Sequence, residues 1–165
     1  MKPFLGTLVF TIFIPGSFVI VLPIFIGLAS RSQPFAGYSP AGPLLILAGV
    51  VIYIWAATAF VQDGKGTPSP TAPPLEFVAI GPYRYVRNPI YVGDLIVIIG
   101  ITAIFGSALV LFYASGLFAI LYLFIVGYEE PDLRRRFGSA YEDYVREVGR
   151  WLPLRYMLRQ ISEKE

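Results

Sequence analysis

Residues 95–128 read LIVIIGITAIFGSALVLFYASGLFAILYLFIVGY and contain no charged side chain. A helix needs about 20 residues to cross a bilayer, so this run is too long for one crossing and too short for two with a loop. A helical hairpin resolves the mismatch if its first arm begins at Asn88-Pro89, because Asn favours the N-cap and Pro the first helical position. The sequence therefore predicts arms at 89–105 and 108–128 that turn at Gly106-Ser107.

A turn at Ser115-Gly116 is the alternative, although it shortens the second arm. Two further apolar runs, residues 4–29 and 43–61, are each long enough to cross a bilayer. The chain is 56% hydrophobic and 15% charged, whereas a soluble domain carries about 25% charged residues. We therefore expect an all-α integral membrane protein with about four transmembrane helices, the first kinked by Pro15 and Pro23.

The expected organisation is a single membrane domain over residues 1–165. Two transmembrane helices occupy 1–61, a cytosolic loop with a polar motif occupies 62–88, and the hairpin occupies 89–128. The tail at 129–165 is expected to be cytosolic and interfacial. Within it, GSAYEDYVREVGRWLP places aromatic and apolar side chains on one helical face, which is typical of a helix lying on a membrane surface; LRYMLRQ repeats the pattern.

The chain contains neither cysteine nor histidine. Thiolate zinc sites, iron–sulfur clusters, His-ligated haem and Ser-His-Asp catalysis are excluded for lack of their ligands, and we expect no metal site. Net charge is +2, which does not predict a nucleic-acid partner.

Most of the positive charge is expected on one side of the membrane. Four spans place Lys2, Lys65 and the basic tail together, and only Arg31 opposes them. Because positive charge marks the cytoplasmic side, this predicts both termini inside. The short loops favour a prokaryotic inner membrane, with membrane lipids as partners.

A polar motif, GPYRYVRNPIYVGD, occupies residues 81–94 at the start of the hairpin. Tyrosine and arginine are common at membrane interfaces, so simple anchoring is one interpretation. Three features favour a binding site: the helix beginning at Asn88 offers free N–H groups, Asp94 is a costly charge inside it, and the hairpin returns Glu129 and Glu130 to the same side. Pairing of these acids with the arginines at 134–136 is the structural alternative.

This combination of groups suits a zwitterionic ligand. Arginines bind a carboxylate, acids accept hydrogen bonds from an amine or from ribose hydroxyls, and tyrosine rings favour a neighbouring cation. S-adenosylmethionine carries all of these groups, including a sulfonium.

GPYRYVRNPIYVG, followed by YEEPDLRRRFGSAYEDYVREVGRWLP, resembles the C-terminal half of isoprenylcysteine carboxyl methyltransferases, and phospholipid methyltransferases are similar there. The resemblance covers residues 80–153 and implies a membrane-embedded methyltransferase that uses S-adenosylmethionine without a Rossmann domain. It implies that the cofactor contacts Gly81, Tyr83, Arg84, Arg87, Asn88, Tyr91, Glu129, Glu130 and Tyr141. It also implies that Arg150 contacts the substrate and that Glu130 is the catalytic candidate.

The chain departs from the family pattern at Asn88, where the family has histidine. Asn cannot titrate near neutral pH, so a carboxylate or thiolate acceptor is chemically easier than an amine, which must lose a proton. We expect a lipophilic or prenylated acceptor from the bilayer. Two alternatives are a non-catalytic membrane binding or assembly protein that retains the fold, and a sterol-reductase-like enzyme that uses NADPH.

Overall fold

The computed structural model describes residues 2–30, 39–64 and 75–162, where every regular element is a helix. Arg31, Lys65 and most of the two loops that contain them lie outside the described residues. In chain order the elements are α1 (Lys2–Phe13), η1 (Gly16–Val21), α2 (Leu22–Ala29), α3 (Ala41–Gln62), η2 (Gly81–Arg84), α4 (Pro89–Phe105), α5 (Ala108–Phe124), η3 (Ile125–Glu129), α6 (Glu130–Phe137), α7 (Ser139–Glu147) and α8 (Leu154–Ser162).

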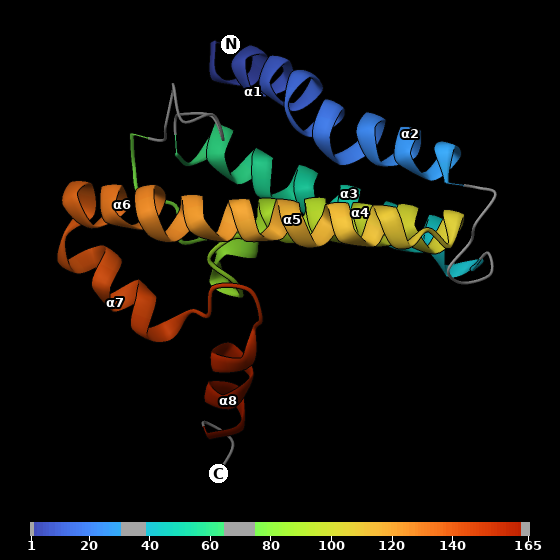
Figure 1. Ribbon diagram of the computed structural model, residues 1–165. Coiled ribbons are helices and arrows are strands. Elements are labelled where there is room, and N and C mark those ends of the chain that lie inside the picture. Colours follow the sequence, from blue (N-terminus) through green and yellow to red (C-terminus); the bar gives the residue numbers. More distant parts are fainter. Residues whose placement is uncertain (1, 31–38, 65–74, 163–165) are drawn as a thin grey trace.

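The expected all-α membrane protein is confirmed. Three helices in the described residues are long and apolar enough to cross a membrane: Phe4–Ala29, Ala41–Gln62 and Ala108–Phe137. The shorter apolar helix α4 lies alongside them, and the four run up and down in sequence order (Figure 1). Large apolar side chains cover the outside of the bundle, as expected where lipid replaces water.

The helices α3 and α4 form the most closely packed pair. A Cβ atom on Gly93 would lie 2.7 Å from the Gly49 carbonyl oxygen, and one on Gly100 would lie 2.8 Å from that of Gly42. Such distances leave no room for a side chain, so the two backbones touch through glycine. Small residues at an interface are the usual means of close helix packing in membranes.

The first span is distorted where the sequence predicts a kink. Pro15 lies directly before the π-helical segment η1, while the chain continues through Pro23 as the regular helix α2. Proline removes one helical hydrogen bond and crowds the preceding turn. Because η1 is the turn that precedes Pro23, this effect of Pro23 accounts for the wider turn between the two prolines. Figure 1 shows this span lying beside the other helices, along one side of the bundle.

The hairpin turns at Gly106-Ser107, as expected, and the alternative turn within α5 is wrong. Gly106 adopts a left-handed conformation with φ of 58°, which glycine tolerates without strain. The hydroxyl of Ser107 accepts a hydrogen bond from the Val110 N–H at 3.3 Å and caps α5. The second arm extends further than predicted, because α5, η3 and α6 continue as one helix to Phe137.

The tail folds back along the outside of the bundle. The helix α7 is the expected amphipathic helix, and its Tyr141 is buried. The predicted apolar face ran on to Trp151, but the helix ends at Glu147 and an extended segment follows. That segment reaches the start of α4 through an isolated parallel bridge between Val86 and Gly149.

Candidate functional site

A cavity of about 860 Å³ lies between the first span, α4 and α5, within the 300–1,000 Å³ range of small-molecule sites. Its apolar wall combines the first span and α5: Phe10, Ile14, Pro15, Phe18, Val19, Leu22, Tyr113, Gly116, Leu117, Ile120, Leu121 and Phe124. Its polar part comes mainly from the motif: Tyr83, Arg87, Asn88, Tyr91, Asp94 and Glu129. One cavity therefore offers polar and apolar surfaces to the same occupant.

Two acidic side chains enter the polar part from different helices. The hydroxyl of Tyr91 donates to Glu129 Oε2 at 3.2 Å, which joins α4 to the end of η3. Asp94 lies about one turn further along α4 and is 8% exposed. It forms no hydrogen bond or ion pair with another described residue. A buried carboxylate without a partner is costly, and Asp94 lines the cavity, which makes this group a candidate for contact with a ligand.

Tyr83 presents an unused hydrogen-bonding group at the same cavity. Its hydroxyl is buried and has no hydrogen-bond partner among the described residues. Burial raises its pKa well above the usual value, and the charge of Glu129 adds to the shift, so the group stays a neutral phenol. Buried polar atoms are normally paired, and an occupant of the cavity can supply the missing partner.

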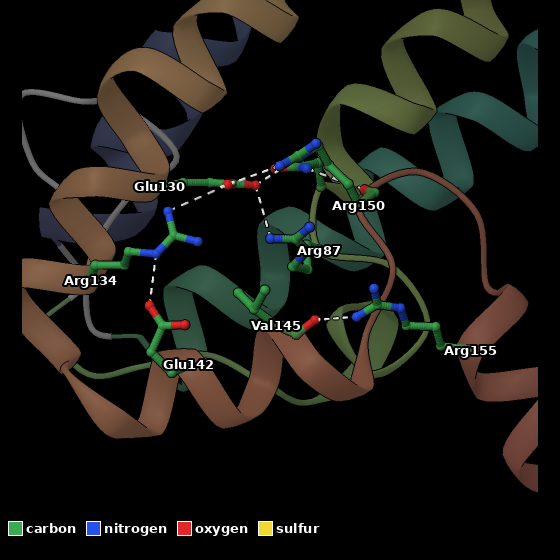
Figure 2. A network of polar contacts seen from close by, with 8 residues as sticks. Arg87, Glu130, Arg134, Glu142, Val145, Arg150 and Arg155 are labelled. Carbon is green, nitrogen blue, oxygen red and sulfur yellow. Dashed lines mark hydrogen bonds and ion pairs between the residues drawn. The ribbon is translucent and has the colours of Figure 1, made fainter.

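Behind the cavity, Glu130 joins two arginines in an ion-pair network (Figure 2). Its Oε1 accepts from Arg87 Nη1 at 2.9 Å and from Arg150 Nε at 2.7 Å, and its Oε2 accepts from Arg150 Nη2 at 3.0 Å. Arg134 approaches to 3.9 Å and bonds chiefly to Glu142. Glu130 is 4% exposed and is not among the residues that line the cavity. Glu130 therefore holds the side chain of Arg87 in place, and Arg87 does line the cavity.

The extended segment after α7 closes over the start of α4. The side-chain amide of Asn88 donates to the Arg150 carbonyl at 3.2 Å, and the Arg87 N–H donates to the Gly149 carbonyl at 2.8 Å. Asn88 occupies the N-cap position but makes no capping hydrogen bond through its side chain. The first turn of α4 is consequently left without a side-chain acceptor for its N–H groups. Such a helix start favours an anion.

The structure divides the predicted site residues into two groups. Those that line the cavity are Tyr83, Arg87, Asn88, Tyr91 and Glu129. The others support or flank it: Gly81 has a positive φ of 57° and packs near Trp55, Arg84 is exposed, and Tyr141 is buried beside the ion-pair network with Glu130 and Arg150.

Sequence reasoning missed most of the apolar wall. Asp94 stood out as a charge inside a helix but was not assigned to the site. Nothing in the first span distinguished Phe18 or Phe10 from other lipid-facing residues, because the whole run is apolar. The only local signal was Pro15, which breaks the helix beside the cavity.

A protein-family comparison covers the motif and the helices around it. Residues 38–140 match the model of the phospholipid methyltransferase family. The chain belongs to this family. Membership covers α3, the motif, the hairpin and the first residues of α7, so it includes the polar part of the cavity and supports a membrane methyltransferase in general. No solved structure gives a significant match.

A curated protein also resembles this family member. The nickel-cobalt-cadmium resistance protein NccN of Alcaligenes xylosoxydans xylosoxydans is 27% identical over 121 residues, covering 73% of this chain and 52% of that protein. The chain thus spans about half the length of this relative. Within the part of the chain that the structure describes, no group of three or more acidic side chains is arranged to hold a metal ion.

Proposed function

We propose that this protein transfers a methyl group from S-adenosylmethionine to a lipophilic acceptor. The observation that carries the proposal is the single cavity in which the family motif meets an apolar wall. A water-soluble donor and a hydrocarbon-bearing acceptor must meet for the reaction, and this cavity has a surface suited to each. Its volume of about 860 Å³ is large for one small ligand.

The residues present fit the proposed cofactor. Arg87 and the uncapped start of α4 suit its carboxylate, Glu129 suits its amine or ribose hydroxyls, and the unpaired hydroxyl of Tyr83 offers a further hydrogen bond. Bound there, S-adenosylmethionine supplies an electrophilic methyl group on a sulfonium. The tyrosine rings of the motif favour a cation in their vicinity.

The protein's own contribution is alignment and exclusion of water. Methyl transfer needs the acceptor atom held in line with the methyl group and stripped of solvent. The segment at Gly149 and Arg150 holds the start of α4 from outside, and the apolar wall excludes water from within. Glu130, proposed from the family pattern as catalytic, supports this arrangement through Arg87.

The chemical class of the methyl acceptor is the most detailed part of the proposal. Without histidine, a carboxylate or thiolate acceptor needs no base and is chemically easier. However, Asp94 and Glu129 line the same cavity, and both repel an anionic acceptor when ionised. Either can also take a proton from an amine. A panel that pairs a long-chain acid, thiol and amine of equal chain length therefore tests both the reaction and the acceptor's charge.

Calorimetric titration of S-adenosylmethionine into detergent-purified protein is the primary test. We expect saturable binding that Glu129→Gln weakens and Glu142→Gln leaves unchanged, because Glu142 is 46% exposed and is not among the residues that line the cavity. A folded sample that binds no cofactor would remove the proposal. Binding without transfer to any acceptor would support the non-catalytic alternative, which Asn88 favours. Binding of NADPH instead would support the reductase.

We further propose that the protein lies in a prokaryotic inner membrane with both termini inside. The support is the charge distribution along the chain and the even number of apolar helices before the basic tail. A reporter fused after α8 that is active only in the cytoplasm would agree. Activity only outside the membrane would reverse the orientation.

A further inference from the structure

The C-terminal helix α8 (Leu154–Ser162) has an apolar face that nothing in the described residues covers. Leu154, Met157 and Leu158 recur at helical spacing and are 56–66% exposed, and Leu152 just before them is 61% exposed. In Figure 1 the helix points away from the bundle and runs crosswise to the spans. A helix crosswise to the spans lies along the membrane plane.

A chain of aromatic contacts sets the level of α8 relative to the bilayer. Tyr156 of α8 packs against Tyr85 with ring centroids 4.8 Å apart, and Tyr85 packs against Trp55 of α3 at 6.1 Å. Trp55 and Tyr85 are themselves 47% and 37% exposed. Exposed tryptophan and tyrosine near the end of a span are typical of the headgroup level, so α8 lies at that level.

The opposite side of α8 is held by the protein. The guanidinium of Arg155 donates to the carbonyl of Val145 near the end of α7 (Figure 2). It also donates to the carbonyl of Arg146 at 2.9 Å. This bond fixes the rotation of α8, because Arg155 occupies the side that faces α7. The sequence of the helix contains two arginines and no acid, which suits an anionic surface.

We propose that α8 is an interfacial anchor whose Leu154, Met157 and Leu158 enter the headgroup boundary of the bilayer that holds the spans. The occupant of this face is lipid, because the helix lies in the membrane plane, at the aromatic level, with a basic sequence. Interfacial helices of this kind bury their apolar face about 5–10 Å into the boundary between headgroups and acyl chains. The anchor also restrains the segment at Gly149 and Arg150 that closes over the start of α4.

The absence of cysteine from the chain makes a site-specific test clean. Met157→Cys and, as a control, Asp143→Cys on the exposed face of α7 are each labelled with an environment-sensitive fluorophore. Asp143 has a side chain that is 70% exposed and lies outside the aromatic contacts. The full chain is reconstituted in phosphatidylcholine vesicles with and without phosphatidylglycerol. Quenching is then measured with aqueous iodide and with lipids that carry a nitroxide high on the acyl chain.

We expect the label at position 157 to be quenched at least twice as strongly by the nitroxide lipid as the label at 143, and to be protected from iodide. Phosphatidylglycerol should strengthen both differences. Equal iodide quenching at the two positions would overturn the proposal, because α8 would then project into water. Protection from both quenchers would also overturn it, since protein rather than lipid would then cover the face. Matched circular dichroism spectra establish that both variants are folded.

Discussion

Glu130→Gln tests whether the buried carboxylate organises the polar end of the bundle. The substitution keeps the shape of the side chain and removes the charge that Arg87 and Arg150 share; their side chains are 10% and 26% exposed. Removing one partner of a buried ion pair typically costs 3–5 kcal/mol. Arg150 can turn partly toward solvent, and Gln retains one acceptor, so we expect a loss of about 3 kcal/mol in the free energy of unfolding.

The assay is thermal unfolding in a mild detergent, followed by circular dichroism. For a chain of this size, a loss of about 3 kcal/mol lowers Tm by roughly 6–12 °C. The matched control is Glu142→Gln, whose carboxylate bonds to Arg134 with both side chains more than 40% exposed. An exposed pair contributes about 0.2–1 kcal/mol. Equal Tm shifts for the two variants would refute the reasoning, because the network would then be as weak as a surface pair.

Three further substitutions, and one control for the second of them, probe the cavity, the helix pair and the hairpin. Glu129→Gln should weaken S-adenosylmethionine binding by roughly tenfold or more, because a hydrogen bond to a charged group contributes about 1.5–3 kcal/mol; calorimetry that shows unchanged affinity would exclude Glu129 from the cofactor site. Gly93→Ala places a Cβ 2.7 Å from the Gly49 carbonyl oxygen and should lower the free energy of unfolding by about 1–3 kcal/mol. Its control, Gly127→Ala, has no atom within 4 Å of the added Cβ and should raise Tm slightly, because alanine favours a helix more than glycine does. A lower Tm for Gly127→Ala than for Gly93→Ala would contradict the close packing of α3 and α4. Ser107→Ala removes the helix cap and the buried bond to the Ser30 hydroxyl and should cost about 1–2 kcal/mol in the same thermal assay. An unchanged Tm would mean that neither bond stabilises the hairpin.

Local chemistry was enough to predict the hairpin from sequence. Pro89 at the first helical position, Gly106 in the left-handed region and Ser107 as a cap each act within a few residues. The structure confirms all three, and the hydroxyl of Ser107 makes a further contact with the distant hydroxyl of Ser30 without losing its capping role. The charge-free run at residues 95–128 left little freedom in where the helices lie.

The partners of Glu130 could be predicted only in part. The hairpin places the acidic pair near the motif, and the bond from Arg87 agrees with that placement, whereas the spacing alternative, the arginines at 134–136, does not give the closest bonds. The bond from Arg150, 20 residues away in sequence, had no signal in the pattern. Which arginine reaches a buried acid depends on how the tail folds back, and that fold depends on the aromatic packing of α7. The periodicity of apolar residues within one helix does not show where the tail packs against the rest of the chain.

The apolar wall of the cavity could not be predicted from the sequence for a different reason. In a membrane protein, side chains that face lipid and side chains that face a cavity are equally apolar, so hydropathy does not separate them. Only the packing of the first span against α5, including the bond from the Tyr113 hydroxyl to the Phe18 carbonyl at 2.7 Å, shows which residues face inward.

The unequal packing on the two sides of the cavity has an evolutionary consequence. Backbone contact through Gly49 and Gly93 leaves α3 and α4 almost no tolerance for larger residues. The first span instead meets the cavity through interchangeable side chains such as Phe10 and Phe18, most of whose neighbours in sequence face outward. Mutation in this span reshapes the apolar part of the cavity while the motif stays intact. A duplicated gene can therefore change the shape of the cavity through one helix and keep the polar motif of the family.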